Sequence, residues 1–158
     1  MPRPVKWRKI ENLPEYRMFK PANIPAFELE ENILKVEELE AIRLRDLEGL
    51  NQTACAEKMK ISRQTFQRIY NKAKKKVADS LINGKAIKVK GGNYTQNICT
   101  LVCEECNHKW KKRIEDIERK GKDKILCPEC GEHDILCDTS NIKGYCGERC
   151  RERKGCKY

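Results

Sequence analysis

The chain has 158 residues, which is enough for one domain or for two small ones. Only 39% of the residues are hydrophobic, 37% are charged, and no uncharged apolar run approaches about 18 residues, so neither a membrane span nor a core large enough for an elaborate enzyme cleft is expected. The formal net charge of +10 indicates a polyanionic partner.

The first 26 residues are predicted to form an extended arm. Prolines at positions 2, 4, 14, 21 and 25 exclude a continuous helix there. The basic side chains Arg3, Lys6, Arg8 and Lys9 suggest an arm that follows a nucleic-acid backbone or enters a minor groove. The favoured alternative is that apolar side chains of the arm, such as Trp7, pack it onto the helices that follow.

Residues 27–83 are nearly free of glycine and proline, and their apolar periodicity predicts three helices at about 36–47, 52–59 and 63–82. Asn51 and Ser62 are suitable N-caps for the second and third helices. The alternating residues 86–90 predict an edge strand. We place a domain boundary at Gly91-Gly92, because nine of the ten cysteines follow it.

The second and third helices have the spacing of a helix-turn-helix, in which a tight turn joins a short helix to a capped, basic long helix. Lys60 stands in the turn where a left-handed residue is needed, at a cost on the order of 1 kcal/mol. The side chains expected in the core are Leu39, Ile42, Leu47, Cys55, Met59, Ile61, Phe66, Ile69, Tyr70, Ala73, Val77 and Leu81.

The outward face of the third helix carries side chains suited to DNA. Residues 51–90 contain eleven basic and only two acidic residues. Arg pairs with guanine, Gln and Asn pair with adenine, and Lys further along the helix is suited to phosphates. The candidate DNA contacts are Arg63, Gln64, Gln67, Arg68, Asn71, Lys72 and Lys75. The alternative is a plain three-helix bundle whose basic face serves solubility only.

Two cysteine pairs, Cys103 with Cys106 and Cys127 with Cys130, have the spacing of a zinc ribbon. Flanking strands are predicted at 98–102 and 124–126. Four thiolates leave no open position on the metal, so the site is expected to hold one structural Zn²⁺ and to have no catalytic role. Iron in a rubredoxin-like arrangement uses similar turns and remains an alternative.

The remaining cysteines of the C-terminal part match no established spacing. Cys137, Cys146, Cys150 and Cys156 could form a second site for zinc, iron or an iron–sulfur cluster, with Cys99 left over. The alternative is a basic appendage without metal. Because the N-terminus has no apolar signal segment, we expect a cytoplasmic protein, in which metal binding is commoner than disulfides.

Several separated motifs resemble those of one protein family. They are Met1-Pro2-Arg3-Pro4 with Lys6 and Arg8, Phe19-Lys20-Pro21, Glu38–Leu44, Asp46–Leu50, and Ser62–Phe66 with Arg68-Ile69. Over roughly residues 1–92 they resemble an uncharacterised prokaryotic family, one of the UPF groups, of predicted DNA-binding proteins. That family's helix-turn-helix is similar to region four of bacterial sigma factors, and members often carry a C-terminal cysteine-rich segment. The resemblance implies binding of duplex DNA through the third helix.

These features predict a mainly α fold. It would comprise a three-helix helix-turn-helix domain with an extended N-terminal arm (1–92), a small β zinc-ribbon-like domain (93–136) and a cysteine-rich basic tail (137–158). We expect a sequence-specific transcription regulator that binds double-stranded DNA, with homodimerisation left open, and no enzyme, since no phosphate-binding glycine loop or nucleophile motif occurs. The alternatives are a metal- or redox-responsive sensor using the extra cysteines, and a protein associated with RNA or RNA polymerase.

Overall fold

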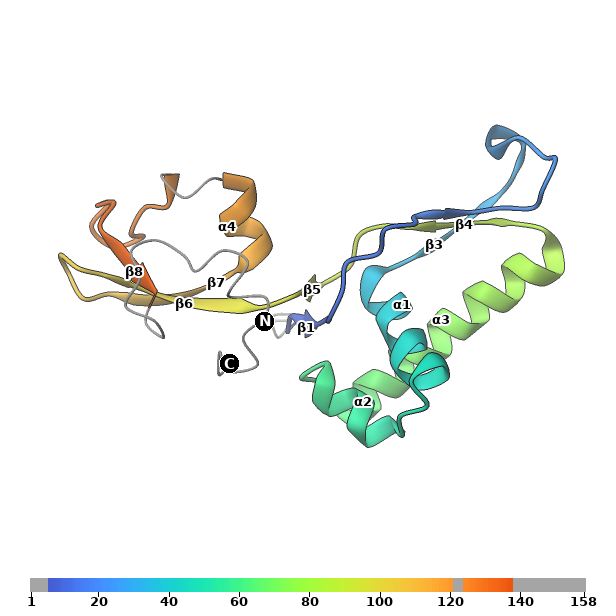
Figure 1. The fold of residues 1–158 in the computed structure, drawn as a ribbon, viewed down its shortest axis with the longest axis horizontal. Helices are drawn as coiled ribbons and strands as arrows, with labels where there is room; N and C mark the ends of the chain where they lie inside the picture. The colour runs from blue at the N-terminus through green and yellow to red at the C-terminus, as the bar shows by residue number, and fades with distance from the viewer. Residues whose placement is uncertain (1–5, 121–123, 138–158) are drawn as a thin grey trace, which may run out of the picture. The chain divides into compact units, whose positions relative to one another are not determined.

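A computed structural model describes residues 6–120 and 124–137 (Figure 1). The chain divides into two compact units, Met1–Tyr94 and Thr95–Tyr158. The division falls just after the Gly91-Gly92 pair. Among the described residues, no helix is both long and apolar enough to cross a membrane.

The helices of the first unit begin where the sequence predicts, the second and third directly after their predicted N-caps. They are α1 (Val36–Ile42), which continues into a π-helical turn (Arg43–Leu47), α2 (Gln52–Lys58) and α3 (Arg63–Asn83), preceded by a 3-10 turn (Ala26–Glu28). Asn51 Oδ1 accepts a hydrogen bond from Ala54 N at 2.8 Å, and Ser62 Oγ accepts one from Thr65 N at 3.2 Å. Lys60 has the expected left-handed backbone, with φ of 56°. These predictions are confirmed.

The three helices enclose a hydrophobic cluster. Its buried members are Ala41, Leu44, Cys55, Ala56, Met59, Phe66, Ile69 and Tyr70. Leu47 and Leu81, which were expected in the core, are 82% and 76% exposed. At Leu47 the cause is the π turn, in which Glu48 N donates to Arg43 O and the α-helical period is lost. Near Leu81 the buried position is taken by Ser80, whose Oγ lies 2.9 Å from Nδ2 of Asn32.

The strands of the first unit join segments that are distant in sequence. β4 (Ala86–Val89) runs parallel to β3 (Glu31–Leu34) and antiparallel to β2 (Met18–Phe19), in the order β2-β4-β3. β1 (Arg8–Lys9) pairs with β5 (Tyr94–Thr95). A second cluster joins this sheet to α1 and α3, and its buried members are Ile10, Leu34, Val36, Ala73 and Val89.

The expectation of a mainly α three-helix domain with an extended arm was wrong. The described residues form four α-helices and three small sheets, and the arm contributes strands to two of these sheets. Proline excludes helix from the arm, but backbone N–H and C=O groups that become buried still need partners. Val89 N donates to Arg17 O at 2.8 Å, and Lys9 N donates to Met59 O at 2.9 Å. β4, predicted as an edge strand, is the central strand of its sheet.

The second unit is built on an antiparallel sheet. β6 (Ile98–Cys103) is central, with β7 (Lys109–Arg113) on one side and β8 (Ile135–Cys137) on the other, and α4 (Ile114–Lys120) follows β7 directly (Figure 1). The strand predicted at 98–102 is confirmed, whereas residues 124–126 form no strand. Ile125 instead packs into a core whose other buried members are Cys99, Leu101, Ile114, Ile117 and Ile135.

The Gly91-Gly92 pair is tied to the start of α1. Val36 N donates to Gly91 O at 3.1 Å, and Asn93 N donates to Glu37 Oε1 at 3.2 Å. Both glycines have positive φ, of 68° and 112°. A Cβ on Gly92 would lie 1.8 Å from Oε2 of the buried Glu37, whereas a Cβ on Gly91 would meet nothing within 4 Å.

Gly92→Ala is therefore expected to destabilise the first unit more than Gly91→Ala does. Both variants carry the strain of a left-handed alanine, on the order of 1–2 kcal/mol. Only Gly92→Ala must also displace buried Glu37, which adds roughly 1–3 kcal/mol. Urea unfolding followed by the helical circular dichroism signal measures the difference. Equal losses in the two variants would contradict this explanation.

Candidate nucleic-acid interface and metal centre

The N-terminal half of α3 presents a polar and cationic face to solvent. Phe66, Ile69, Tyr70 and Ala73 are buried on one side of the helix. All seven candidate DNA contacts are exposed, namely Arg63, Gln64, Gln67, Arg68, Asn71, Lys72 and Lys75. The helical period therefore separates an apolar side from a side that carries Arg, Lys, Gln and Asn.

The turn after α2 holds the start of this helix in place. Ile61 N donates to Ala56 O at 3.0 Å, and the Ile61 side chain packs against the helical core. Nε of Arg63 donates to Oε1 of Gln52 at 3.4 Å. Gln52 therefore lies beside the candidate contacts, although it was not among the residues predicted from the sequence. The sequence feature that could have identified Gln52 is its position directly after the N-cap Asn51.

The lysines further along α3 differ in their contacts. Lys76 Nζ lies 2.6 Å from Oε2 of Glu38. Lys74 Nζ lies 4.4 Å from the centroid of the Tyr70 ring. Lys72 and Lys75 form no ion pair with a described residue. These two lysines therefore keep their charge available to a partner.

Two turns of the same shape carry the four clustered cysteines of the second unit. Asn107 N donates to Cys103 O, and Gly131 N donates to Cys127 O, each at 3.0 Å. Asn107 and Gly131 each follow the second cysteine of a pair and have left-handed φ values of 56° and 78°. The two pairs, separated in sequence, are thus folded into matching knuckles.

Each knuckle also directs a backbone donor at sulfur. The backbone N–H groups of His108 and Glu132 lower the pKa values of the Cys106 and Cys130 thiols, against the raising effect of burial and the neighbouring thiols. Such donors stabilise a thiolate more than a thiol. The turns are therefore suited to deprotonated cysteines.

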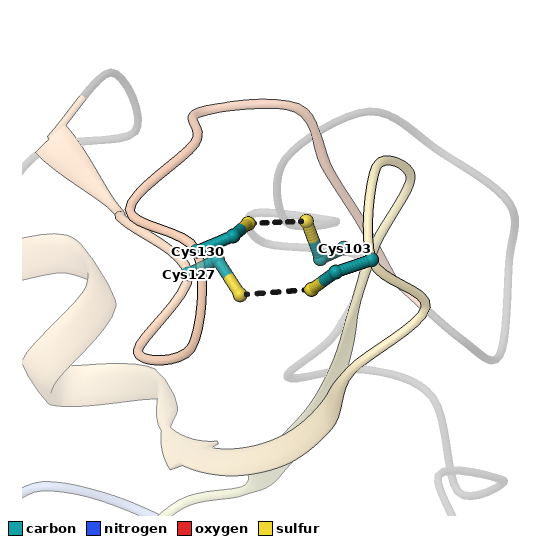
Figure 2. Close-up of side chains that lie close together, drawn as sticks. Cys103, Cys127 and Cys130 are labelled. Carbon is teal, nitrogen blue, oxygen red and sulfur yellow. Dashed lines mark hydrogen bonds between the residues drawn. The ribbon is translucent and has the colours of Figure 1, made fainter.

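The four sulfurs converge on one point (Figure 2). The Sγ atoms of Cys103 and Cys130 lie 3.6 Å apart, as do those of Cys106 and Cys127. All four lie within 4.8 Å of one another. Sulfurs arranged tetrahedrally at about 2.3 Å from Zn²⁺ are separated by roughly 3.8 Å. The cluster therefore fits a zinc ion with little movement of its ligands.

Without a metal, the four neighbouring thiols do not ionise together. Burial raises the pKa of Cys127, but backbone hydrogen bonds from Cys130 and Glu129 and the neighbouring thiols lower it to about 6. A backbone hydrogen bond from Glu132 lowers the pKa of Cys130, but burial and the three neighbouring thiols raise it to about 12. A divalent cation allows all four to ionise together, since it supplies the compensating charge.

The remaining described cysteines lie outside this cluster. Cys55 is fully buried in the helical core, and burial raises the pKa of its thiol, as is typical of a structural side chain. Cys99 and Cys137 are buried on the neighbouring strands β6 and β8. Cys146, Cys150 and Cys156 lie outside the described residues, so a second metal site stays a prediction.

Comparison with known proteins finds a family model and close relatives that match this chain. The model of "Protein of unknown function DUF134" matches residues 1–97. A UPF0251 protein of Clostridium botulinum (strain Hall) is 47% identical over 151 residues, covering 96% of this chain and 91% of the relative. A UPF0251 protein of Clostridium beijerinckii is 44% identical over 151 residues, covering 96% and 97%. No solved structure matches the chain.

Proposed function

The chain belongs to the DUF134 family, and we propose that its first unit binds double-stranded DNA through the N-terminal half of α3. The observation that carries the proposal is the exposed face of α3, where seven polar or cationic side chains stand on a helix anchored by buried packing. A major groove about 12 Å wide admits an α-helix. The chain's net charge of +10 favours a polyanion as the partner.

The mixture of side chains on α3 supports sequence-specific binding. Arg63 and Gln64, in the first turn, and Asn71 are of the types that read guanine and adenine edges. Lys72 and Lys75 are suited to phosphates, which set the register of a protein on the duplex but carry no sequence information. A regulator of transcription is the cellular role that such binding fits.

The second unit contributes a structural metal centre to this proposal. Cys103, Cys106, Cys127 and Cys130 would hold Zn²⁺ as four thiolates, a ligand set typical of structural sites. Iron has similar Fe–S distances in four-thiolate sites, so metal analysis of protein purified anaerobically distinguishes the two ions. Colourless protein with one zinc per chain is the result that this proposal expects.

Arg63→Ala and Lys75→Ala are expected to affect DNA binding differently. Arg63→Ala should cost about 1–3 kcal/mol on the preferred sequence and little on random duplex. Lys75→Ala should weaken binding to all sequences alike and lower the slope of log affinity against log salt by about one. A site selected from a random duplex library, followed by fluorescence anisotropy over a salt series, measures both effects.

Arg17→Ala is the matched control, because it removes one positive charge from an exposed position outside the face of α3. An equal loss of affinity for every sequence in Arg63→Ala would show that the protein binds DNA without sequence specificity. Preference for single-stranded RNA over duplex DNA in direct competition would replace this proposal with the RNA-associated alternative.

A second candidate function is a sensor in which the metal centre controls DNA affinity. The exposure of Cys106 and Cys130 favours it, because exposed thiolates are open to chelators and oxidants. Oxidation or chelation at the exposed pair would then release the metal from the buried ligands Cys103 and Cys127 as well.

A further inference from the structure

An open hollow of about 800 Å³ lies beside the same half of α3. Residues of β1, the start of α1, the α2–α3 turn and α3 line it, all within the first unit. Its cationic side chains are Lys6, Arg8, Lys35, Arg68 and Lys72. The hollow thus connects basic residues near the N-terminus with two of the candidate DNA contacts.

Most of these cations are not neutralised by the protein. Arg8 lies near one carboxylate, but the other four cations form no ion pair with a described residue. Elsewhere in the same unit cations are paired: Arg43, for example, contacts Glu11 at 2.6 Å and Glu40 at 2.8 Å. The positive charge around the hollow is therefore available to a ligand.

Arg8 itself is incompletely paired. Its Nε and Nη1 atoms are shielded from solvent and have no hydrogen-bond partner. The nearest carboxylate oxygen, Oε1 of Glu37, is 3.9 Å from Nη1, too far for a hydrogen bond, and it accepts from Asn93 N. A mostly buried guanidinium in this state is costly, and an anion in the hollow would offset its charge.

Among the described residues, only two acids, Glu37 and Glu38, line the hollow, against five cations. Oε2 of Glu38 accepts from Lys35 N at 2.9 Å and lies 2.6 Å from Lys76 Nζ. The Glu37 side chain is only 4% exposed: its Oε1 accepts from Asn93 N, and its buried Oε2 has no hydrogen-bond partner. Neither carboxylate forms an ion pair with Lys6, Arg68 or Lys72, so the hollow keeps a net positive charge.

We propose that this hollow is a phosphate-binding site. Arg and Lys donors from β1, the start of α1 and α3 suit a phosphate oxygen, and Ser62 and Thr65 also line the hollow. The phosphate comes either from the backbone of a duplex or from a free phosphorylated small molecule. If the phosphate belongs to a duplex, the inference rests on the proposed function and adds a second line of contacts beside α3. If it belongs to a free small molecule, that ligand competes with DNA for Arg68 and Lys72.

The test uses the full metal-loaded chain with Lys35→Ala, Arg8→Gln and the control Arg17→Ala. One arm measures affinity for a random-sequence duplex over a salt series. The other titrates inorganic phosphate and AMP by calorimetry. For a backbone phosphate, Lys35→Ala and Arg8→Gln each lower the salt slope by about one, and Arg17→Ala leaves it unchanged. For a free ligand, inorganic phosphate or AMP binds the wild-type protein, and this binding is lost in Arg8→Gln. The salt slope of duplex binding is then unchanged in Lys35→Ala and Arg8→Gln.

Absence of both effects, or equal effects in Arg17→Ala, overturns the phosphate site. Failure of the proposed function is distinguishable from this outcome. A wild-type protein that binds no duplex refutes DNA binding by α3, yet the calorimetric arm still decides whether the hollow binds phosphate. Asn71→Ala completes the comparison, because it should lower affinity for a selected site without changing the salt slope.

Discussion

Removing the metal is expected to unfold the second unit while α1, α2 and α3 stay folded. Binding of a structural Zn²⁺ supplies on the order of 10–16 kcal/mol to small folds that lack a stable metal-free state. The described parts of this unit, 95–120 and 124–137, have a single small core. The described residues of the first unit form two hydrophobic clusters of their own and contribute nothing to the cysteine cluster. Two-dimensional NMR before and after chelation resolves the two units separately.

Single-residue variants make this test specific to the metal. The side chain of Cys106 is exposed, so without a metal role Cys106→Ser should change stability by about 0.5 kcal/mol or less. As a ligand, Cys106 should be indispensable, and the variant should lose bound metal and the folded spectrum of the second unit. Glu105→Ser, an exposed neighbour in the same knuckle, is the control. A folded, metal-free second unit would refute the structural role.

The chelated sample also separates the two candidate functions. In a plain regulator, duplex affinity survives chelation because α3 belongs to the other unit. In a sensor, affinity falls while the helical signals of the first unit persist. Restoration by added zinc excludes irreversible damage as the cause.

The parts of the fold that could be predicted from the sequence depend on local interactions. The N-caps at Asn51 and Ser62 act within three residues, and the left-handed Lys60 is set by the turn that contains it. The two cysteine knuckles close through bonds between residues four apart. Such features can be predicted because they depend on residues that are close together in the sequence.

The errors concern pairings between distant segments. The β2-β4-β3 sheet joins residues near 18, 32 and 88, and nothing in the local pattern of the proline-rich arm specifies β4 as its partner. The π turn at Arg43–Leu47 likewise breaks the α-helical period, although the apolar pattern of the sequence continues through it. The hollow beside α3 depends on another long-range pairing, since Arg8 lies on β1, which pairs with β5. The candidate contacts of α3 were predictable because they need only a helix and its buried side.

Phe66→Ala is expected to cost the first unit about 3–5 kcal/mol. Phe66 is fully buried, and its ring stacks on that of Tyr70 with centroids 5.8 Å apart and planes 11° apart. The hydroxyl of Tyr70 donates to Oδ1 of Asp46 at 2.7 Å, so loss of the Phe66 ring also loosens a contact that ties α3 to the turn after α1. Urea unfolding followed by helical circular dichroism measures the loss. Phe27→Ala, at an 87% exposed position, should change stability by no more than about 0.5 kcal/mol.

The same variant distinguishes a loss of fold from a loss of recognition. Phe66→Ala removes no group that faces a ligand, so it should lower affinity for every duplex in proportion to the unfolded fraction, and cooling toward the temperature of maximum stability should restore binding. Arg63→Ala should instead lower affinity for the preferred site at every temperature, with an unchanged unfolding curve. If Phe66→Ala selectively weakened the preferred sequence while the unit stayed folded, the buried side of α3 would be setting the orientation of its contacts, and specificity could not be assigned to the exposed side chains alone.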